Sequence, residues 1–198
     1  MKEIIGLVTI ILAIVGHAPY ILDTIRGKTK PHLFTWLTWS FVVSLAFLGQ
    51  LSEGAGAGAW STGITGLLVI IIALLALKNG TKDITKTDSI FFVAALLAII
   101  PWYLTNDPTI SIIMATIIDA CAFIPTIRKT IKDPTSETLA TYALNLLRHG
   151  LSLLALSNYN LATVLYPSYL LVMNLIITGV MLRPQDLYER YVLKRKTK

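Results

Sequence analysis

The chain has 198 residues, of which 55% are hydrophobic and 14% are charged. This composition excludes an ordinary soluble domain, in which roughly a quarter of the residues are charged, and indicates membrane spans of about 20 residues each. The net charge of +6 does not indicate a nucleic-acid partner, because the Lys and Arg residues lie in short loops between apolar runs, as they do in membrane proteins.

Seven apolar runs are predicted to cross the membrane as helices. In chain order they are residues 4–25, 33–51, 57–77, 88–104, 109–131, 137–157 and 161–182. No small-residue cleavage site follows the first run, so we interpret it as a span and not as a signal peptide. The sequence therefore predicts an all-α, multi-pass membrane protein.

One stretch of the sequence occurs twice. Residues 19–36 and 125–142 align without a gap at an offset of 106 residues, the separation of Pro19 and Pro125, and seven positions are identical in the two copies. Each copy ends an apolar run, crosses a short basic turn and begins another run. Such internal repetition predicts one helical hairpin used twice.

The repeat predicts how the chain is organised. The expected parts are a first three-helix repeat (1–80), a linker transmembrane helix (81–106), a second three-helix repeat (107–184) and a basic cytoplasmic tail (185–198). Because a single helix joins the two repeats, both should have the same orientation in the membrane. Transporters with parallel repeats of this kind bind their solute near the midplane, between the repeats.

The distribution of basic residues predicts the orientation. Fifteen Lys and Arg lie on one side of the predicted membrane, Lys2 lies on the other, and Arg148 lies inside a span. By the positive-inside rule the C-terminus is cytoplasmic and the N-terminus is outside. The short loops favour a prokaryotic cytoplasmic membrane.

The three-plus-one-plus-three arrangement, with Pro19 and Pro125 near the inner ends of the first helices of the repeats, resembles the SWEET and PQ-loop (MtN3-like) superfamily of membrane transporters. The Pro-Gln pair of that superfamily is Pro19-Tyr20 and Pro125-Thr126 here, so the glutamine is absent from both copies. The resemblance implies alternating access without a cofactor, with a small polar solute such as a sugar, a nucleoside or vitamin, or an amino acid as the cargo.

The resemblance extends to candidate solute contacts. Trp36 and Trp39, with Asn145 across the pseudo-axis, resemble the tryptophan- and asparagine-lined sites of SWEETs and of the PnuC vitamin transporters. Trp39 is expected to offer a stacking surface for a sugar or flat ring. Asn145 and Asn174 have amide groups suited to a hydroxylated or amide ligand, although each could equally bond a neighbouring helix.

Two charged residues are predicted near the midplane, Asp119 in the fifth run and Arg148 in the sixth. An isolated charge there costs at least ~2.5–3.5 kcal/mol on insertion scales, so we expect the two to face inward as a pair. The pair could specify helix packing only. Alternatively Asp119 is a protonatable coupling residue with Arg148 as its partner, as the resemblance to proton-coupled PQ-loop proteins implies, and Arg148 could also contact solute.

The remaining candidates concern movement and gating. Pro19 and Pro125 are expected to act either as hinges or as static kinks, since proline removes a backbone hydrogen bond from a helix. Trp36 and its repeat equivalent are interpreted as an inner gate or as interfacial aromatic residues, and two further aromatic residues as an outer gate or belt. His17 and His149 are secondary polar candidates, either packing residues or proton relays. The gate residues are Trp36, Tyr142, Trp60 and Tyr166.

Enzyme chemistry finds no support in the sequence. The three histidines lie in separate segments, and there is no HExxH, no G-x-S-x-G and no phosphate-binding glycine loop. The single cysteine, Cys121, excludes an internal disulfide and a thiolate metal cluster. A receptor of the same fold and a structural membrane protein remain alternatives to a transporter. The expected partners are a small solute and the lipid bilayer; a homo-oligomer is compatible with both repeats lying in one chain.

Overall fold

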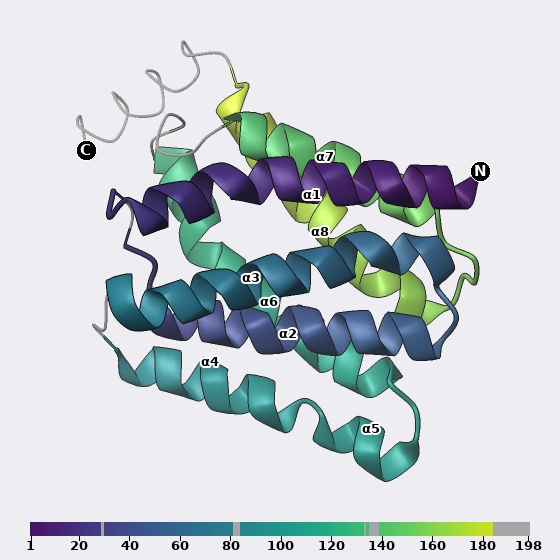
Figure 1. Cartoon of the computed structure of the whole chain (residues 1–198). Coiled ribbons are helices and arrows are strands. Elements are labelled where there is room, and N and C mark those ends of the chain that lie inside the picture. The colour runs from purple at the N-terminus through teal and green to yellow at the C-terminus, as the bar shows by residue number, and fades with distance from the viewer. Residues whose placement is uncertain (29, 81–83, 133, 135–138, 184–198) are drawn as a thin grey trace, which may run out of the picture.

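The computed structural model describes residues 1–28, 30–80, 84–132, 134 and 139–183. Every regular element in this part of the chain is helical (Figure 1), which confirms the all-α part of the predicted fold class. The elements are α1 (Lys2–Ile25), α2 (Leu33–Ser52), the short 3-10 helix η1 (Gly56–Ala59), α3 (Trp60–Asn79), α4 (Lys86–Leu97), α5 (Ile100–Thr105), α6 (Thr109–Lys132), α7 (Leu139–Leu154) and α8 (Leu161–Met181). The basic tail and the start of the sixth predicted run lie outside the described residues.

Among the described residues, five helical segments are long and apolar enough to cross a membrane, judged by length and composition: α1, α2, η1 with α3, α4 with α5, and α8. Large apolar side chains on their outer surfaces are exposed, including Ile11, Leu67 and Leu74, each about 60%. Such exposure is unfavourable in water and acceptable in hydrocarbon. Several apolar helices of this kind are consistent with a membrane protein. In α6 the described apolar segment is the shorter Thr109–Phe123, and α7 has 16 residues.

The helix ends follow local chemistry. His32 caps α2 by accepting a hydrogen bond from the Thr35 backbone N–H at 3.4 Å, and Thr85 with Asp88 forms a capping box before α4. The predicted fourth run is not one continuous helix, however. It ends at Leu97 and resumes as α5, with Pro101 in the first turn, because proline has no N–H and its ring clashes with the preceding turn.

Six helices form a closed ring. Each contacts the next in the order α1, α3, α2, α6, α8, α7 and back to α1, while α4 packs outside against α2 and α6 (Figure 1). The order within the first three helices, α1–α3–α2, is matched by α6–α8–α7. The interior of the ring is therefore bounded by helices from both copies of the sequence repeat.

Burial matches across the repeat offset at some positions and not at others. Thr24 and its equivalent Thr130 are both fully buried, and so are Gln50 and Leu156. The start of α2 at Leu33 and the described start of α7 at Leu139 are also separated by the repeat offset of 106 residues. The members of these two pairs are buried alike although Gln50 and Leu156 differ in type, whereas Leu33 is 8% exposed and Leu139 is 38% exposed.

The two ends of the bundle are tied differently. At the end that holds Met1, the α2–α3 loop is bonded to the α7–α8 loop: Asn158 Nδ2 donates to the Glu53 carbonyl oxygen at 2.9 Å, Asn160 Nδ2 to Glu53 Oε2 at 2.8 Å, and Ser157 N–H to the Ala55 carbonyl oxygen at 2.9 Å. We name these three bonds the Met1-end latch. They join the two halves of the ring.

At the opposite end, which holds Arg26, two long-range bonds of the described residues each lie within one half. Asn79 Nδ2 donates to the Thr24 carbonyl oxygen at 3.3 Å, between α3 and α1. Arg183 Nη2 donates to the Ile131 carbonyl oxygen at 2.5 Å, between the end of α8 and α6. Each of these two bonds ties neighbouring helices of the same half.

Candidate functional site

A cavity of about 150 Å³ lies inside the ring, and all six ring helices contribute side chains to its wall. This volume is close to that of an engineered protein cavity that binds benzene. The lining side chains extend from Trp36, one turn into α2 from the Arg26 end, to Thr62 in the first turn of α3 at the Met1 end. A small ligand could be enclosed here by both halves of the molecule.

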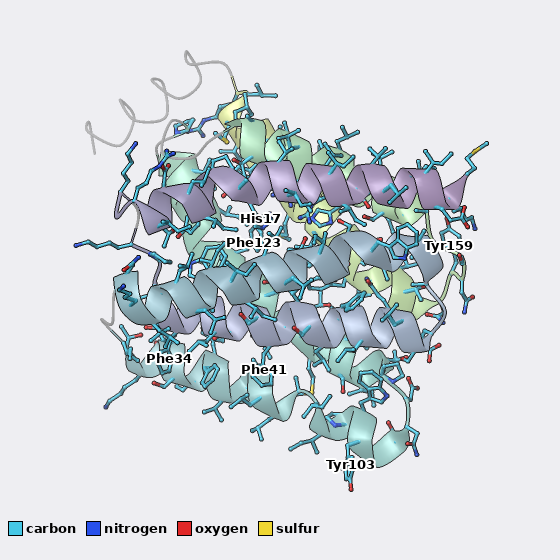
Figure 2. The ribbon with its side chains drawn as sticks, in the orientation of Figure 1. His17, Phe34, Phe41, Tyr103, Phe123 and Tyr159 are labelled. Carbon is cyan, nitrogen blue, oxygen red and sulfur yellow. The ribbon has the colours of Figure 1, made fainter. Side chains whose placement is uncertain are left out.

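Three repeat-equivalent pairs line the cavity: His17 with Phe123, Trp39 with Asn145, and Val43 with His149. Figure 2 labels His17 and Phe123 in the interior of the bundle. The sequence prediction that Trp39 and Asn145 face a common space across the pseudo-axis agrees with their positions. Phe123 was not predicted, although the offset of 106 residues from His17 points to it.

Arg148 forms one polar wall. Its side chain is 3% exposed, and its Nη1 donates to the hydroxyl oxygens of Thr65 and Ser61, the latter at 3.4 Å. Thr65 donates its own proton to the Ser61 carbonyl oxygen at 2.7 Å. Its oxygen is therefore oriented as an acceptor for the guanidinium. The Nε of Arg148 is buried without a hydrogen-bond partner.

Two histidines lie on the same side of the cavity as Arg148. His149 Nε2 is 3.1 Å from Arg148 Nη2; because arginine can only donate, this nitrogen must accept and be unprotonated. His17 Nδ1 is 2.8 Å from the Ala13 carbonyl oxygen, which can only accept, so Nδ1 has the proton. Both rings are thus fixed in one tautomer by their neighbours.

Asp119 forms a second polar wall, with 3% of its side chain exposed. The donors that face its carboxyl are the indole of Trp39 and the hydroxyl of Tyr169. Neither reaches full hydrogen-bonding geometry: Asp119 Oδ2, Trp39 Nε1 and Tyr169 Oη are all buried without a partner. An unpartnered buried polar group costs roughly 1–3 kcal/mol, so this wall is poorly satisfied by protein groups alone.

The predicted direct pairing of Asp119 with Arg148 is not formed. Both residues line the same cavity, but the described residues contain no ion pair between them. The reason is the order of the ring, in which α8 lies between α6 and α7. The two charges face the cavity from separate walls.

Aromatic rings cover much of the remaining wall. The centroids of Trp36 and Trp39 are 5.2 Å apart in an edge-to-face arrangement, and Tyr20 lies 4.9 Å from Trp36. Tyr166, 1% exposed, is 6.1 Å from Tyr169. Tyr166 therefore lines the cavity, deeper than the outer-gate or belt position expected for it. Rings at such spacings pack favourably and provide rigid surfaces.

Other candidates lie away from the cavity. Asn174 is buried at 2% exposure in α8 and donates from Nδ2 to the Leu170 carbonyl oxygen at 2.7 Å, while its Oδ1 has no partner. Tyr142 is half-buried on α7 outside the cavity lining. Trp60 lines a separate apolar groove of α1, α2 and α3, so the suggested outer pair of Trp60 and Tyr166 does not share one space.

The prolines lie inside helices as expected. Pro19 is within α1 and exposed on its outer surface, and Pro125 is within α6, with its side chain outside the described atoms. A third proline, Pro167, is buried inside α8 and was not singled out in the sequence. Whether the first two act as hinges stays a prediction.

Sequence reasoning missed Thr65 and Tyr169. A threonine in a membrane helix usually bonds its own backbone, as Thr65 does, so its type gave no signal. Tyr169 lies near the predicted outer end of the last run, where an aromatic belt or an outer gate is the usual interpretation. No group of three His, Cys, Asp or Glu in the described residues is placed to hold a metal ion.

Comparison with protein-family models, with curated proteins and with solved structures gives no match for this chain. The interpretation of the cavity therefore rests on its geometry and chemistry.

Proposed function

We propose that this protein is a multi-pass membrane transporter that moves a small polar solute by alternating access. The observation that supports this most directly is the central cavity, because all six ring helices line it and three repeat-equivalent pairs face it from opposite halves. Movement of one half against the other would change access to such a cavity from either end. Sites of this kind lie at the repeat interface of parallel-repeat transporters.

In this proposal α1–α3 and α6–α8 are the two repeats, and α4 with α5 is the linker outside the ring. The matching contact orders α1–α3–α2 and α6–α8–α7 support two units of the same construction. The excess of Lys and Arg supports a cytoplasmic Arg26 end. The resemblance to the SWEET and PQ-loop superfamily agrees with this assignment, and a prokaryotic cytoplasmic membrane is the location we propose.

The Met1-end latch suggests which conformation is described. Its bonds join Glu53 and Ala55 of one half to Ser157, Asn158 and Asn160 of the other. Opening the cavity toward the Met1 end would require breaking them. We therefore interpret the structure as closed at the outer end, with the latch as part of the outer gate in place of a Trp60–Tyr166 pair.

A structural role would leave the polar walls without an explanation. Arg148 Nε, Asp119 Oδ2 and Trp39 Nε1 are buried without partners on residues that line one cavity. A scaffold gains nothing from such groups, since each costs free energy in a medium of low dielectric constant. A receptor would share the binding site, but it would bind without flux.

The test is counterflow in proteoliposomes preloaded with a panel of sugars, amino acids, nucleosides and vitamins. We expect exchange of one class of solute, lost in Trp39→Ala and Asn145→Ala. Tyr103→Ala is the matched control, because Tyr103 is 83% exposed and points away from the bundle on α5 (Figure 2). A folded protein that binds a panel member without exchange would be a receptor, and one that neither binds nor exchanges would be structural.

A further inference from the structure

We infer that the solute of this cavity has a carboxylate, which Arg148 binds, and a hydrogen-bond donor, an ammonium or a hydroxyl, directed at Asp119. The inference rests on the proposed transport function and names the class of solute. The observation behind it is a buried cation and a buried carboxyl group that line one cavity without forming an ion pair.

The Arg148 wall lacks a negative charge. The hydrogen-bond partners of its guanidinium are the hydroxyls of Ser61 and Thr65 and the unprotonated Nε2 of His149, all neutral. None of the described carboxylates pairs with it. A buried cation with neutral partners is unfavourable, so this wall favours an anion supplied by the ligand.

The geometry of a guanidinium favours a carboxylate for that anion. Its planar fork of N–H groups matches two carboxylate oxygens, and the unpartnered Nε of Arg148 leaves one such donor free. A phosphate would bring up to two negative charges toward a single arginine. Asp119 in the same cavity would then repel the excess charge.

The Asp119 wall needs a donor. An ionised carboxylate only accepts hydrogen bonds, and Oδ2 of Asp119 is buried without one. Trp39 and Tyr169 face this carboxyl but leave that oxygen unsatisfied. A ligand ammonium or hydroxyl would complete it, and the two polar ends of the ligand would match the two walls.

The size of the cavity limits the ligand. A space of about 150 Å³ corresponds to about six non-hydrogen atoms, as in benzene. L-Alanine and L-lactate have this size, and each has a carboxylate with an amino or hydroxyl group beside it. Both are therefore suitable probes, and they separate the amino from the hydroxyl form of the donor.

The experiment measures the counterflow of L-alanine and of L-lactate and compares each with the counterflow of four control probes. Propionate lacks the donor, L-alaninamide lacks the carboxylate, glucose lacks charge, and inorganic phosphate offers a different anion. Binding is measured in parallel by tryptophan fluorescence, since Trp36 and Trp39 line the cavity. We expect exchange of alanine or lactate, at least about tenfold weaker exchange of propionate, the effect of one lost charged hydrogen bond, and none of the other three.

Arg148→Gln should abolish exchange and binding of the carboxylates, and Arg148→Lys should restore part of the binding. Arg183→Gln is the matched control, because this arginine bonds the Ile131 carbonyl oxygen outside the cavity. If Arg148→Gln does not fold, Thr65→Val keeps the charge and removes the oxygen that orients the guanidinium. That variant should raise the half-saturating concentration about tenfold.

The outcomes separate this inference from the proposed function. Exchange of glucose, alaninamide or phosphate without exchange of alanine or lactate would overturn the inference and leave a transporter. No exchange of any probe, with saturable alanine or lactate binding that Arg148→Gln removes, would overturn transport and retain the carboxylate site. Absence of both exchange and binding of the carboxylates would overturn the inference.

Discussion

Removal of the Glu53 side chain should open the Met1 end of the bundle more often. Glu53 Oε2 accepts a hydrogen bond from Asn160 Nδ2 at 2.8 Å across the two halves. Glu53→Ala removes this bond and keeps the one from Asn158 to the Glu53 carbonyl oxygen. Asn160 is a poorer choice for substitution, because its side chain also caps α8.

The expected size of the effect follows from the geometry. A hydrogen bond to a charged group contributes about 1.5–3 kcal/mol net. The Glu53–Asn160 bond is only partly buried, so water can replace part of it, and we expect a loss of about 1 kcal/mol. Such a change shifts the equilibrium between closed and open forms about fivefold toward the open form.

The assay uses the rate of cysteine modification from the Met1 side. Cys121 is the only cysteine, so Cys121→Ala gives a cysteine-free background, and Ser152→Cys places a thiol at a site that is 1% exposed on α7. When opening and closing are fast compared with modification, the rate follows the open population. We expect Glu53→Ala to raise the rate about fivefold.

Asp107→Ala provides the control at the same end. Asp107 accepts a hydrogen bond from the Thr109 backbone N–H at 2.8 Å within one half of the ring, and its hydrogen bonds with Thr109 lower the pKa of the Asp107 carboxyl. This substitution removes a comparable charge without touching the latch. If Glu53→Ala left the modification rate of Ser152→Cys unchanged, or if Asp107→Ala raised it equally, the reasoning about the latch would be wrong.

Two further predictions concern packing and access. Gly58→Ala should lower stability in detergent by about 1–3 kcal/mol, because a Cβ there would lie 2.8 Å from Leu156 Cα. Gly179→Ala is the control and should not lower it, since nothing lies within 4 Å of a Cβ at that position. Equal melting temperatures of the two variants would contradict the close approach at Gly58. Trp39→Ala should speed chemical modification of Cys121. Trp39 lines both the cavity and a pocket toward the Arg26 end that Cys121 also lines, so its indole separates the two spaces. An unchanged rate would mean that Trp39 does not separate them.

The helical elements were largely predictable, because the length of each apolar run can be read directly from the sequence. The predicted runs 33–51 and 161–182 differ from α2 and α8 by one residue at one end. The exception is the run 88–104, where Pro101 starts a separate helix. Proline is tolerated inside membrane helices such as α1 and α8, so its presence alone does not tell a break from a continuous span.

The sequence pointed to many residues of the site, but their mutual positions were predictable only where the repeat supplied spatial information. The offset of 106 residues related Trp39 to Asn145, and both line the cavity. The expected contact between Asp119 and Arg148 was predicted only from their similar depth in the membrane. Depth specifies how far along a helix a residue lies but not which helices are neighbours. Because α8 separates α6 from α7 in the ring, equal depth did not produce contact.

In the proposed arrangement, the two repeats contribute different chemistry to one cavity. The positions equivalent to Asp119 and Arg148 are Ala13 and Val42, which are buried and apolar, so the second repeat supplies both charges. The first repeat supplies groups that face them: Trp39 toward Asp119, and Thr65 toward Arg148. Symmetric helix contacts suit a rocking movement of two similar halves. Unequal walls fix the direction of a polar ligand, which a symmetric site could not do. The separation of the two charges is therefore the feature that best distinguishes a binding site from a packing interaction in this protein.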